Sequence, residues 1–377
     1  MIKRIIQNII ENKLYDKKAI ILLGPRQSGK TTLLHSTVEN LNIKTLWLDG
    51  DEPDIRQMLP NATSTTLKTL IGNNKLVVID EAQRIENIGL CIKLIVDNIK
   101  NVSVIASGSS SLELANKINE PLTGRKWQFY LYPISFLEMV QHTSILEEKR
   151  QLENRLIYGS YPEIINNPGN QKNLLFHLSD SYLYKDILTW EQIHKPDKLE
   201  RLLQAIAFQL GNEVSYLELS QITGLDNETV EKYIDLLEKS FIVFRLGSLS
   251  RNLRNELKKS KKIYFFDNGI RNAVIKSFGP LQLRNDIGAL WENYLISERM
   301  KYMNYSEIYA NTFFWRTLTQ QEIDYIEERD GNFYAYEFKW NVKAKAKFPK
   351  AFSENYKNSY IELITPDNYF NFLGYKF

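Results

Sequence analysis

The chain has 377 residues, a length typical of two or three domains. Its formal net charge of only +3 excludes a protein that coats nucleic acid through a global positive charge, although local basic patches remain open. One cysteine excludes an internal disulfide and multi-cysteine metal sites, and four histidines argue against a histidine-rich metal centre.

The first 14 residues place isoleucines and a leucine at helical spacing, with polar residues between them. This pattern predicts an amphipathic helix rather than a signal peptide. No stretch approaches the roughly 18 apolar residues that a membrane span needs. We therefore expect a soluble cytoplasmic protein that makes no membrane contact.

The next segment alternates strands with helices. Short apolar runs at residues 19–23, 45–48, 76–79 and 102–106 predict buried strands, and residues 31–41 and 85–99 show helical patterns. Buried strands joined by helices predict an α/β fold with a parallel sheet covered on both faces. A strand at 127–131 and a helix opening near Pro133 complete a domain that we assign to residues 1–142.

The middle segment, residues 143–250, is almost wholly helical. A helix-turn-helix pattern surrounds Gly224, and residues 241–246 and 262–266 resemble the strands of a wing. The last segment, residues 251–377, predicts a long helix at 283–303 and strands at 308–315, 322–327 and 333–340.

Residues 24–31 read G-P-R-Q-S-G-K-T and match the phosphate-loop pattern G-x-x-x-x-G-K-[ST] between a strand and a helix. The backbone N–H groups of such a turn bind phosphate oxygens, Lys30 reaches the β- and γ-phosphates, and the Thr31 hydroxyl binds magnesium. A glycine turn formed by chance is the alternative. The predicted ATP-binding residues are Gly24, Arg26, Gln27, Ser28, Gly29, Lys30, Thr31 and Thr32.

Two acidic residues, Asp80 and Glu81, end the strand at 76–79. Ligands of open α/β sheets bind at that end of the strands. We expect Asp80 to hold Mg²⁺ and Glu81 to activate the attacking water as a catalytic base. An ordinary strand-to-loop boundary would carry the same residues, but the phosphate loop upstream favours the functional interpretation.

Two further catalytic candidates follow. Ser109, which follows the strand at 102–106, would sense the γ-phosphate or orient the water, or would only cap a helix. Arg125 would stabilise charge in the transition state, either on the nucleotide of its own chain or on that of a neighbour in a homo-oligomer. A merely solvated arginine is the alternative.

These motifs together resemble the prokaryotic AAA-type ATPases that carry a C-terminal domain of unknown function. The resemblance rests on residues 24–33, 80–84, 108–110, 123–125 and 133–136 and extends through residues 158–163, 265–269, 315–316 and 322–324. It implies a P-loop NTPase sheet, a winged-helix module and a C-terminal α/β fold of the PD-(D/E)XK nuclease type. ATP and Mg²⁺ are the cofactors that it implies.

Charge argues against base reading by the second helix of the helix-turn-helix. Residues 226–239 hold five acidic residues and two lysines, and phosphates would repel them. Basic residues instead concentrate at 245–262 and 339–350, with Trp315, Trp340 and Phe348 near them in sequence. These stretches are a candidate DNA surface or an ordinary solvated lysine face.

A hairpin near the C-terminus predicts a second metal site. If Asp330-Gly331 forms a two-residue turn, Asp324 lies opposite Glu337, and Lys339 shares their face. The other face, with Ile323, Tyr325, Tyr336 and Phe338, should be buried.

Two facing carboxylates favour a divalent cation between them. The arrangement resembles the PD-(D/E)XK nucleases, with Glu292 as a further acid, although Ile323 stands where that pattern has proline. A solvated hairpin with a Glu322–Lys339 ion pair is the alternative. The sequence thus predicts a Mg²⁺-dependent ATPase coupled to a nuclease-like domain that acts on nucleic acid, or else a nucleotide-gated regulator that does not cut.

Overall fold

The computed structural model describes residues 1–109, 114, 117–190, 196–250, 261–317, 319–345 and 348–376, with the backbone alone for 181–190. The chain forms two compact units. Unit 1 comprises Met1–Ile134 and Lys239–Phe241, and unit 2 comprises Ser135–Glu238 and Ile242–Phe377. The first division therefore lies eight residues before the predicted boundary at residue 142.

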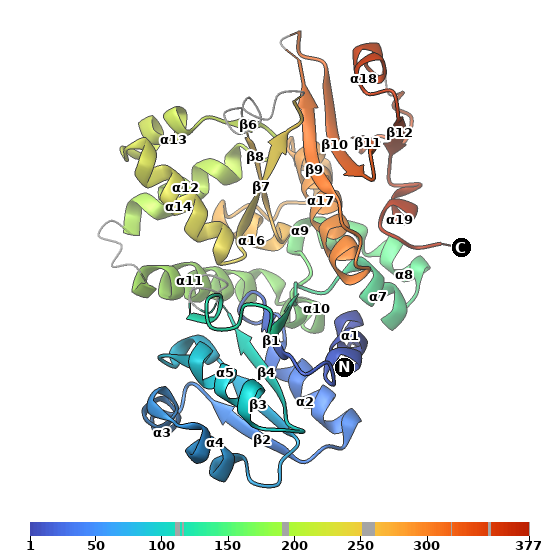
Figure 1. The fold of residues 1–377 in the computed structure, drawn as a ribbon. Helices are drawn as coiled ribbons and strands as arrows, with labels where there is room; N and C mark the ends of the chain where they lie inside the picture. Colours follow the sequence, from blue (N-terminus) through green and yellow to red (C-terminus); the bar gives the residue numbers. More distant parts are fainter. Residues whose placement is uncertain are drawn as a thin grey trace. The chain divides into compact units, whose positions relative to one another are not determined.

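Unit 1 is built on a five-stranded sheet with the strand order β2-β3-β4-β1-β5, and every strand pair in it is parallel. Figure 1 shows this sheet between helices. The elements are α1 (Ile5–Lys13), β1 (Ala19–Leu23), α2 (Lys30–Leu41), β2 (Thr45–Asp49), α3 (Pro53–Met58), α4 (Ser64–Ile71), β3 (Leu76–Asp80), α5 (Ile88–Asn98), β4 (Ser103–Gly108) and β5 (Lys126–Tyr130).

The burial of unit 1 confirms the predicted sheet. Every residue of β1 and of β3 is buried, as expected for central parallel strands covered on both faces. Helices α1 and α2 lie on one face of the sheet, and α3, α4 and α5 lie on the other. The N-terminal helix buries Ile6 and Ile10, which confirms the amphipathic pattern.

Unit 2 contains the rest of the helices and a second sheet. Its elements are α7 (Phe136–His142), α8 (Ile145–Arg150), α9 (Leu152–Tyr158), α10 (Pro162–Asn166), α11 (Gln171–Trp190), α12 (Pro196–Phe208), β6 (Glu213–Val214), α13 (Tyr216–Thr223), α14 (Asn227–Lys239), β7 (Val243–Ser248), β8 (Lys261–Phe265), α16 (Asn268–Val274), α17 (Ile287–Tyr305), β9 (Asn311–Arg316), β10 (Glu322–Arg329), β11 (Asn332–Phe338), α18 (Lys350–Asn355), β12 (Ser359–Ile364) and α19 (Tyr369–Phe372).

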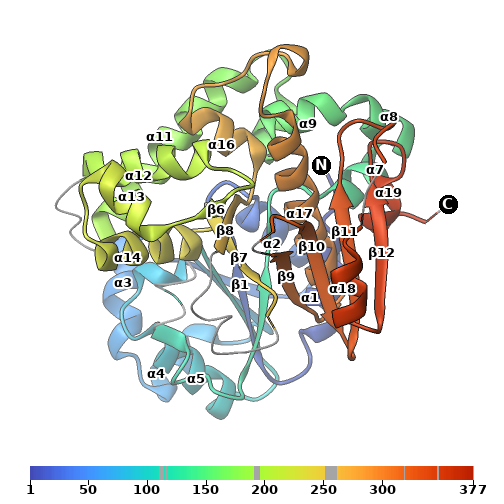
Figure 2. The same ribbon diagram turned by 90° about the horizontal axis from the view of Figure 1, so that it is seen from above.

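One seven-stranded sheet runs through unit 2, in the order β12-β11-β10-β9-β7-β8-β6. The predicted wing strands, β7 and β8, pair with each other, and β7 also pairs in parallel with β9. That pairing joins the segments predicted as separate domains, 143–250 and 251–377, into a single unit. Figure 2 shows the strands of this sheet from above.

The predicted hairpin forms in the predicted register. Arg329 pairs with Asn332 and Tyr325 pairs with Tyr336, around a turn in which Asp330 and Gly331 both have positive φ. A register shift between Ile323 and Ile326 interrupts the pairing of β10 with β9.

The irregularity changes the neighbours of Ile323. Its side chain is buried, as predicted, but it packs in a cluster with Ile326 and Ala335. Tyr325 instead stacks beside Phe338 and contacts Phe372 of α19. Ile323 therefore does not share the apolar environment of Tyr325, which strict alternation along the strand had predicted.

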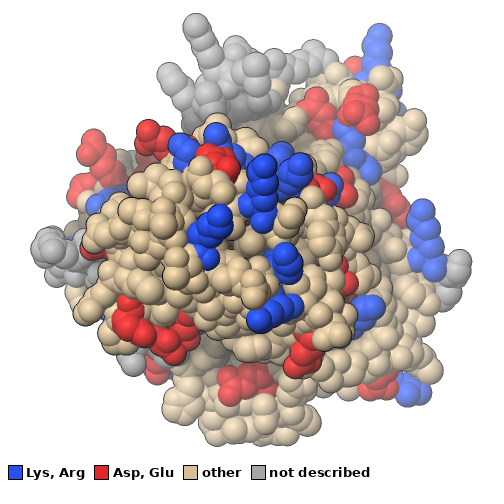
Figure 3. All heavy atoms as spheres, turned by 60° about the horizontal axis from the view of Figure 1, so that its bottom comes forward, with Lys and Arg blue, Asp and Glu red and all other residues tan. Residues whose placement is uncertain are grey.

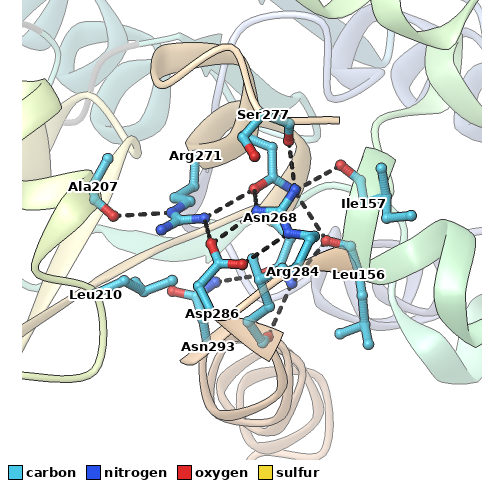
Figure 4. A network of polar contacts seen from close by, with 12 residues as sticks. Leu156, Ile157, Ala207, Leu210, Asn268, Arg271, Ser277, Arg284, Asp286 and Asn293 are labelled. Atoms are coloured by element: carbon cyan, nitrogen blue, oxygen red, sulfur yellow. Dashed lines mark hydrogen bonds and ion pairs between the residues drawn. The ribbon is translucent and has the colours of Figure 1, made fainter. Parts of the chain in front are cut away.

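A buried polar network ties α16 to the start of α17. The side chains of Arg271 and Arg284 both point at the carboxylate of Asp286 (Figure 4). Arg271 also donates to the carbonyl of Ala207 at 3.0 Å, and Asn272 donates to the carbonyl of Ile157 at 2.8 Å. The network thus links four helices through side chains that would be costly to bury alone.

The segments 158–163 and 265–269, which carried part of the family resemblance, meet in this region. The carboxylate of Asp267 accepts hydrogen bonds from the backbone of Ser160 at 2.7 Å and of Gly269 at 2.8 Å. A Cβ at Gly159 would lie 1.9 Å from Asp267, so only glycine fits there. These motifs are explained by packing inside unit 2.

None of the helices in the described part of the chain has the length and apolar character that a membrane span requires.

The charge network predicts a pH dependence of stability. Burial alone would raise the pKa of Asp286, but hydrogen bonds from Arg284 and Arg271 outweigh it and hold the pKa at about 2. Because the folded-state pKa lies below the unfolded value, this stabilisation is present above pH 4 and is lost as the pH falls toward 2.

We therefore expect Asp286→Asn to lower the free energy of unfolding at pH 7 by about 1–2 kcal/mol, a range reduced for partial solvent screening. Denaturant titration of wild type and variant at several pH values measures the difference. The two curves should approach each other below pH 4 and converge only near pH 2. A difference that stays constant with pH would contradict the assignment.

Candidate functional site

The phosphate loop lies between β1 and α2, as predicted. Gly29 has φ +93°, a conformation that favours glycine, and α2 begins at the next residue. A Cβ at Gly24 would lie 2.1 Å from the carbonyl oxygen of Leu131, so a side chain is excluded there too. Both glycines of the motif thus have a structural cause, and the loop directs a helix N-terminus at its ligand site.

Side chains hold the loop in shape. The Lys30 ammonium donates to the carbonyl oxygens of Gly24 at 3.0 Å and Pro25 at 2.9 Å, and the Ser28 hydroxyl donates to Pro25 at 2.8 Å. Arg4 donates to the carbonyl of Ser28 at 2.8 Å. Sequence reasoning missed Arg4, because it precedes the first helix and belongs to no motif.

Thr31 and Asp80 meet where the motif predicts a magnesium site. The Thr31 hydroxyl donates to Asp80 Oδ2 at 2.7 Å, and the Ser107 hydroxyl donates to Asp80 Oδ1. A hydroxyl and a carboxylate are oxygen ligands of the kind that Mg²⁺ prefers, so the residues present fit this ion. Ser107, at the end of β4, holds the carboxylate in place from the other side.

Glu81 is held by two neighbours at the same edge of the sheet. Gln83 donates to Glu81 Oε2 at 2.5 Å and to the Ser109 hydroxyl at 3.1 Å, and that hydroxyl lies 3.4 Å from the same carboxylate oxygen. Glu81 itself has φ +46°, and a Cβ at Gly50 would lie 2.4 Å from its carbonyl oxygen. The close approach of Gly50 therefore allows the turn that presents the carboxylate.

Sequence reasoning had placed Ser109 near the reaction but had missed Gln83 as a functional residue. The position of Gln83, two residues after the acidic pair, is the only signal of its role that the sequence offers. Thr32 and Gln27 are exposed, and Arg26 is partly exposed. All three lie on the loop or at the start of α2, and their contact with a nucleotide stays a prediction.

Arg125 does not lie with these residues. Its carbonyl accepts a hydrogen bond from the N–H of Ala19 at 2.9 Å, at the beginning of β1, whereas the phosphate loop follows the end of that strand. Its guanidinium pairs with Asp97 at 2.8 Å. Action on the nucleotide of its own domain does not fit this position, and action on a neighbouring subunit stays a prediction.

A second group of charged side chains gathers in unit 2, where the sequence predicts a metal site. Asp324 accepts from the N–H of Phe338 at 2.8 Å, and Lys339 donates to Glu337 at 2.5 Å. Glu292 of α17 joins them, as predicted. The alternative Glu322–Lys339 pair does not form, because Glu322 pairs with Lys262 at 2.6 Å.

Lys262 is the residue that sequence reasoning missed. Its side chain is 1% exposed, and its ammonium lies 3.0 Å from Glu292 Oε1 as well as 2.6 Å from Glu322 Oε1. In sequence it ends a run of lysines and resembles a surface residue. Only the pairing of β8 with β7 and β6 buries it beside the acids.

The charged side chains of this cluster shift one another's pKa values. Burial, together with Glu292 and Glu337, raises the pKa of the Asp324 carboxyl well above its usual range. Burial alone would lower the pKa of Lys262, but Glu292, Glu322 and Asp324 outweigh it and raise that pKa. Lys262 therefore carries a full positive charge at neutral pH among carboxylates.

No group of three or more His, Cys, Asp or Glu side chains is placed to hold a metal ion in the described part of the chain. In the unit 2 cluster, the ammonium of Lys262 supplies a cation beside the acids. An amino group of the protein itself thus compensates part of the negative charge at the predicted metal site of Asp324 and Glu337.

The predicted DNA surfaces of the C-terminal half are also partly neutralised. Arg245 pairs with Asp235 and Glu238, Lys262 is buried, and Lys339 pairs with Glu337. Residues 251–260, with two arginines and two lysines, and Lys347 lie outside the described residues. Lys343, Lys345 and Lys350 are exposed.

Comparison with known families assigns three segments. Residues 16–140 match an AAA domain, residues 149–281 match a domain of unknown function (DUF8612), and residues 287–368 match another domain of unknown function (DUF4143). The AAA match covers the phosphate loop, Asp80, Glu81 and Ser109. Unit 1 therefore carries an AAA-type P-loop ATPase domain.

Related proteins are known from distant organisms and are described as uncharacterized. A protein of Mycobacterium tuberculosis is 24% identical over 335 residues, which span 88% of this chain and 72% of that protein. One of Haemophilus influenzae is 22% identical and covers 69% of this chain and 70% of its own length. One of Methanocaldococcus jannaschii is 25% identical, with 74% and 66% covered.

Two solved structures illustrate the similarity of the fold. A Walker-type ATPase of Pyrococcus abyssi has a TM-score of 0.49 at 14% identity and covers 73% of this chain and 96% of that one. A RuvB protein of Thermotoga maritima has a TM-score of 0.33 at 13% identity, with 74% and 95% covered.

The loop geometry predicts the result of removing Lys30. Lys30→Ala takes away the ammonium that the loop holds against its carbonyls and that would contact phosphate, so we expect nucleotide affinity to fall at least about 10-fold. Titration with a fluorescent ATP analogue measures it. Lys68→Ala, at an exposed position on α4, is the matched control. Equal affinity of wild type and Lys30→Ala would contradict the site.

Proposed function

We propose that unit 1 binds ATP·Mg²⁺ and hydrolyses ATP. The observation that carries this proposal is the arrangement of two carboxylates at one edge of the sheet. Asp80 is joined to Thr31 of the phosphate loop, and Glu81 is oriented by Gln83 and Ser109. One carboxylate is thus placed for a metal ion and the other for a water molecule.

The residues divide the work of hydrolysis. The backbone of the phosphate loop and Lys30 bind the phosphates, and Thr31 and Asp80 would hold the metal. Bound Mg²⁺ would neutralise charge on the phosphate oxygens. Glu81 accepts a proton from the attacking water while the water oxygen bonds the γ-phosphorus and the bond to the bridging oxygen breaks, leaving ADP. Gln83 and Ser109 position Glu81 for this transfer.

Replacing the base tests the mechanism. Glu81→Gln keeps the size and polarity of the side chain but cannot accept a proton, so we expect single-turnover hydrolysis to fall by about 10²–10⁴. ATP affinity should change little, because Glu81 does not contact the loop. Glu86→Gln, an exposed position of the same segment, is the control. A single-turnover rate equal to that of wild type would rule out Glu81 as the base.

For unit 2 we propose a winged-helix module joined to a nuclease-like domain. The order α12, β6, α13, α14, β7, β8, with β8 between β7 and β6, supports the winged-helix assignment. Helix α14 exposes acidic residues, and two of its acids pair with Arg245. The module therefore packs against its own sheet rather than reading bases.

The nuclease-like domain has two candidate roles. Metal-dependent cleavage of nucleic acid is favoured by the proximity of Asp324, Glu337 and Lys339. Regulation or binding without cleavage is favoured by Lys262, whose ammonium compensates the same cluster. We favour the second role, because a buried lysine paired with two carboxylates opposes the entry of a divalent ion.

Lys262→Met distinguishes these roles. Removing the ammonium leaves Glu292, Glu322 and Asp324 uncompensated, so we expect a loss of about 3–5 kcal/mol in the free energy of unfolding. Mn²⁺ should then raise the thermal midpoint of the variant more than that of wild type. An equal effect of Mn²⁺ on both proteins would contradict the idea that Lys262 occupies the place of a metal.

A cleavage assay completes the test. Wild type with Mg²⁺ or Mn²⁺, with and without ATP, should leave plasmid and linear DNA intact. Cleavage by wild type that is lost in Asp324→Ala/Glu337→Ala, with ATP hydrolysis retained, would establish the nuclease role and overturn our preference.

A further inference from the structure

The loops that precede the strands of unit 1 are rich in basic residues that belong neither to the phosphate site nor to unit 2. Residues 16–18, 42–44, 72–75, 98–101 and 124–126 precede or begin the five strands, and together they hold seven basic residues and one acidic residue. Three of these loops carry the pattern Asn-x-Lys directly before or near the strand. The basic residues are Lys17, Lys18, Lys44, Lys75, Lys100, Arg125 and Lys126.

The parallel sheet brings these loops to one edge. Because every strand pair is parallel, all five strands begin at the edge opposite the phosphate loop. Backbone hydrogen bonds fix the order: Lys75 N–H donates to Lys44 at 2.8 Å, and Ser103 N–H donates to Lys75 at 2.9 Å. Strands lie roughly 4.8 Å apart, so the five loops form a row about 19 Å long.

Four lysines of this row are exposed and have no acidic partner in the described part of the chain, and Lys18 beside them is partly exposed. Among the described residues, no acidic side chain forms an ion pair with Lys17, Lys44, Lys75 or Lys100, and all four are exposed. The two acids nearest in sequence are taken by other partners: Asp16 pairs with Lys13 at 3.4 Å, and Asp97 pairs with Arg125 at 2.8 Å. Figure 3 views the molecule toward the bottom of Figure 1, and lysine and arginine side chains gather near the middle of that face.

We propose that this row, Lys17–Lys18, Lys44, Lys75 and Lys100, binds the phosphate backbone of a nucleic acid. A line of charges at fixed spacing complements a linear polyanion, and it gives contacts that do not depend on base sequence. Asn42, Asn73 and Asn98 stand two residues before Lys44, Lys75 and Lys100, and asparagine amides also donate to phosphate oxygens.

A membrane surface fits the row less well. Interfacial binding needs large apolar side chains beside the basic ones, to enter the acyl boundary. Of the five loops' immediate surroundings, only Tyr15 is a large apolar residue with high exposure, at 67%. Trp127 lies under the ammonium groups of Lys13 and Lys18 rather than facing solvent alone. Tyr15 instead offers a face on which an unpaired base can stack.

The row differs in kind from the basic stretches of the C-terminal half. There, several of the described basic side chains form ion pairs with acidic residues of unit 2. Here the backbone of adjacent parallel strands fixes the positions, and the side chains remain available. The site is also separate from the phosphate loop, so binding of nucleic acid and binding of ATP use opposite edges of one sheet.

The test uses the triple variant Lys44→Gln/Lys75→Gln/Lys100→Gln of the full chain. Fluorescence anisotropy measures the affinity for a labelled DNA duplex, and for a single strand of equal length, between about 50 and 200 mM salt without nucleotide. We expect the variant to lose about 10-fold or more in affinity. The slope of log affinity against log salt should fall by about 2–3, since each phosphate contact contributes about 0.7–0.9.

The matched control is Lys3→Gln/Lys276→Gln/Lys357→Gln, which removes the same charge at exposed positions outside the row. It should keep the wild-type affinity and slope. Equal binding and slope in wild type and row variant would overturn the proposal. So would the absence of DNA binding by wild type, or binding of anionic phospholipid vesicles in its place.

Thermal midpoints and ATP turnover of the row variant should match those of wild type, because the row lies away from the phosphate loop. This readout separates the proposal from the proposed ATPase activity. Loss of DNA affinity with turnover retained supports the row, whereas failure of wild type to hydrolyse ATP would leave the DNA result unaffected.

Discussion

The parallel alignment of five strands is the constraint on which unit 1 depends. It brings every strand end to one edge, so that the phosphate loop after β1, Asp80 and Glu81 after β3, and Ser109 after β4 lie together. In the sequence these residues belong to three separate motifs, and the fold brings the motifs together. The same alignment collects the strand beginnings at the other edge, where the lysines stand. One sheet thus has an edge built for a nucleotide and an edge with unneutralised positive charge.

Unit 2 depends on a different constraint, the need to compensate buried charge. Arg271, Arg284 and Asp286 form one network of ion pairs. Lys262 forms ion pairs with Glu292 and Glu322 in another. Removing one charged side chain from either network would lower the free energy of unfolding, because its partner would be left as an unpaired charge in the interior without solvation. A cluster of buried carboxylates that is compensated by an ammonium group keeps its fold without a metal. This is why the fold of unit 2 does not by itself imply cleavage.

The sequence predicts local structure and motif chemistry well where these depend on near neighbours. The buried strands of unit 1, the phosphate loop and the register of the Asp330–Gly331 hairpin follow from such patterns. It fails where a long-range pairing decides the environment. Lys262 has the sequence pattern of a surface lysine, and only the pairing of β8 with β7 buries it. Arg125 is a candidate for the nucleotide of its own chain until the pairing of β5 with β1 places it at the far edge, and its action on a neighbouring subunit stays a prediction. Ile323 likewise changes its neighbours through an irregularity that alternation does not encode.

The proposed hydrolysis of ATP by unit 1 requires a metal held by Thr31 and Asp80. The most direct measurement is phosphate release by the wild-type full chain at saturating ATP, with Mg²⁺ present and then removed by a chelator. We expect saturable release of phosphate with Mg²⁺, near-complete loss of release on chelation, and full recovery when Mg²⁺ is returned. Release that is unaffected by chelation, or no release under either condition although ATP binds, would contradict the proposal.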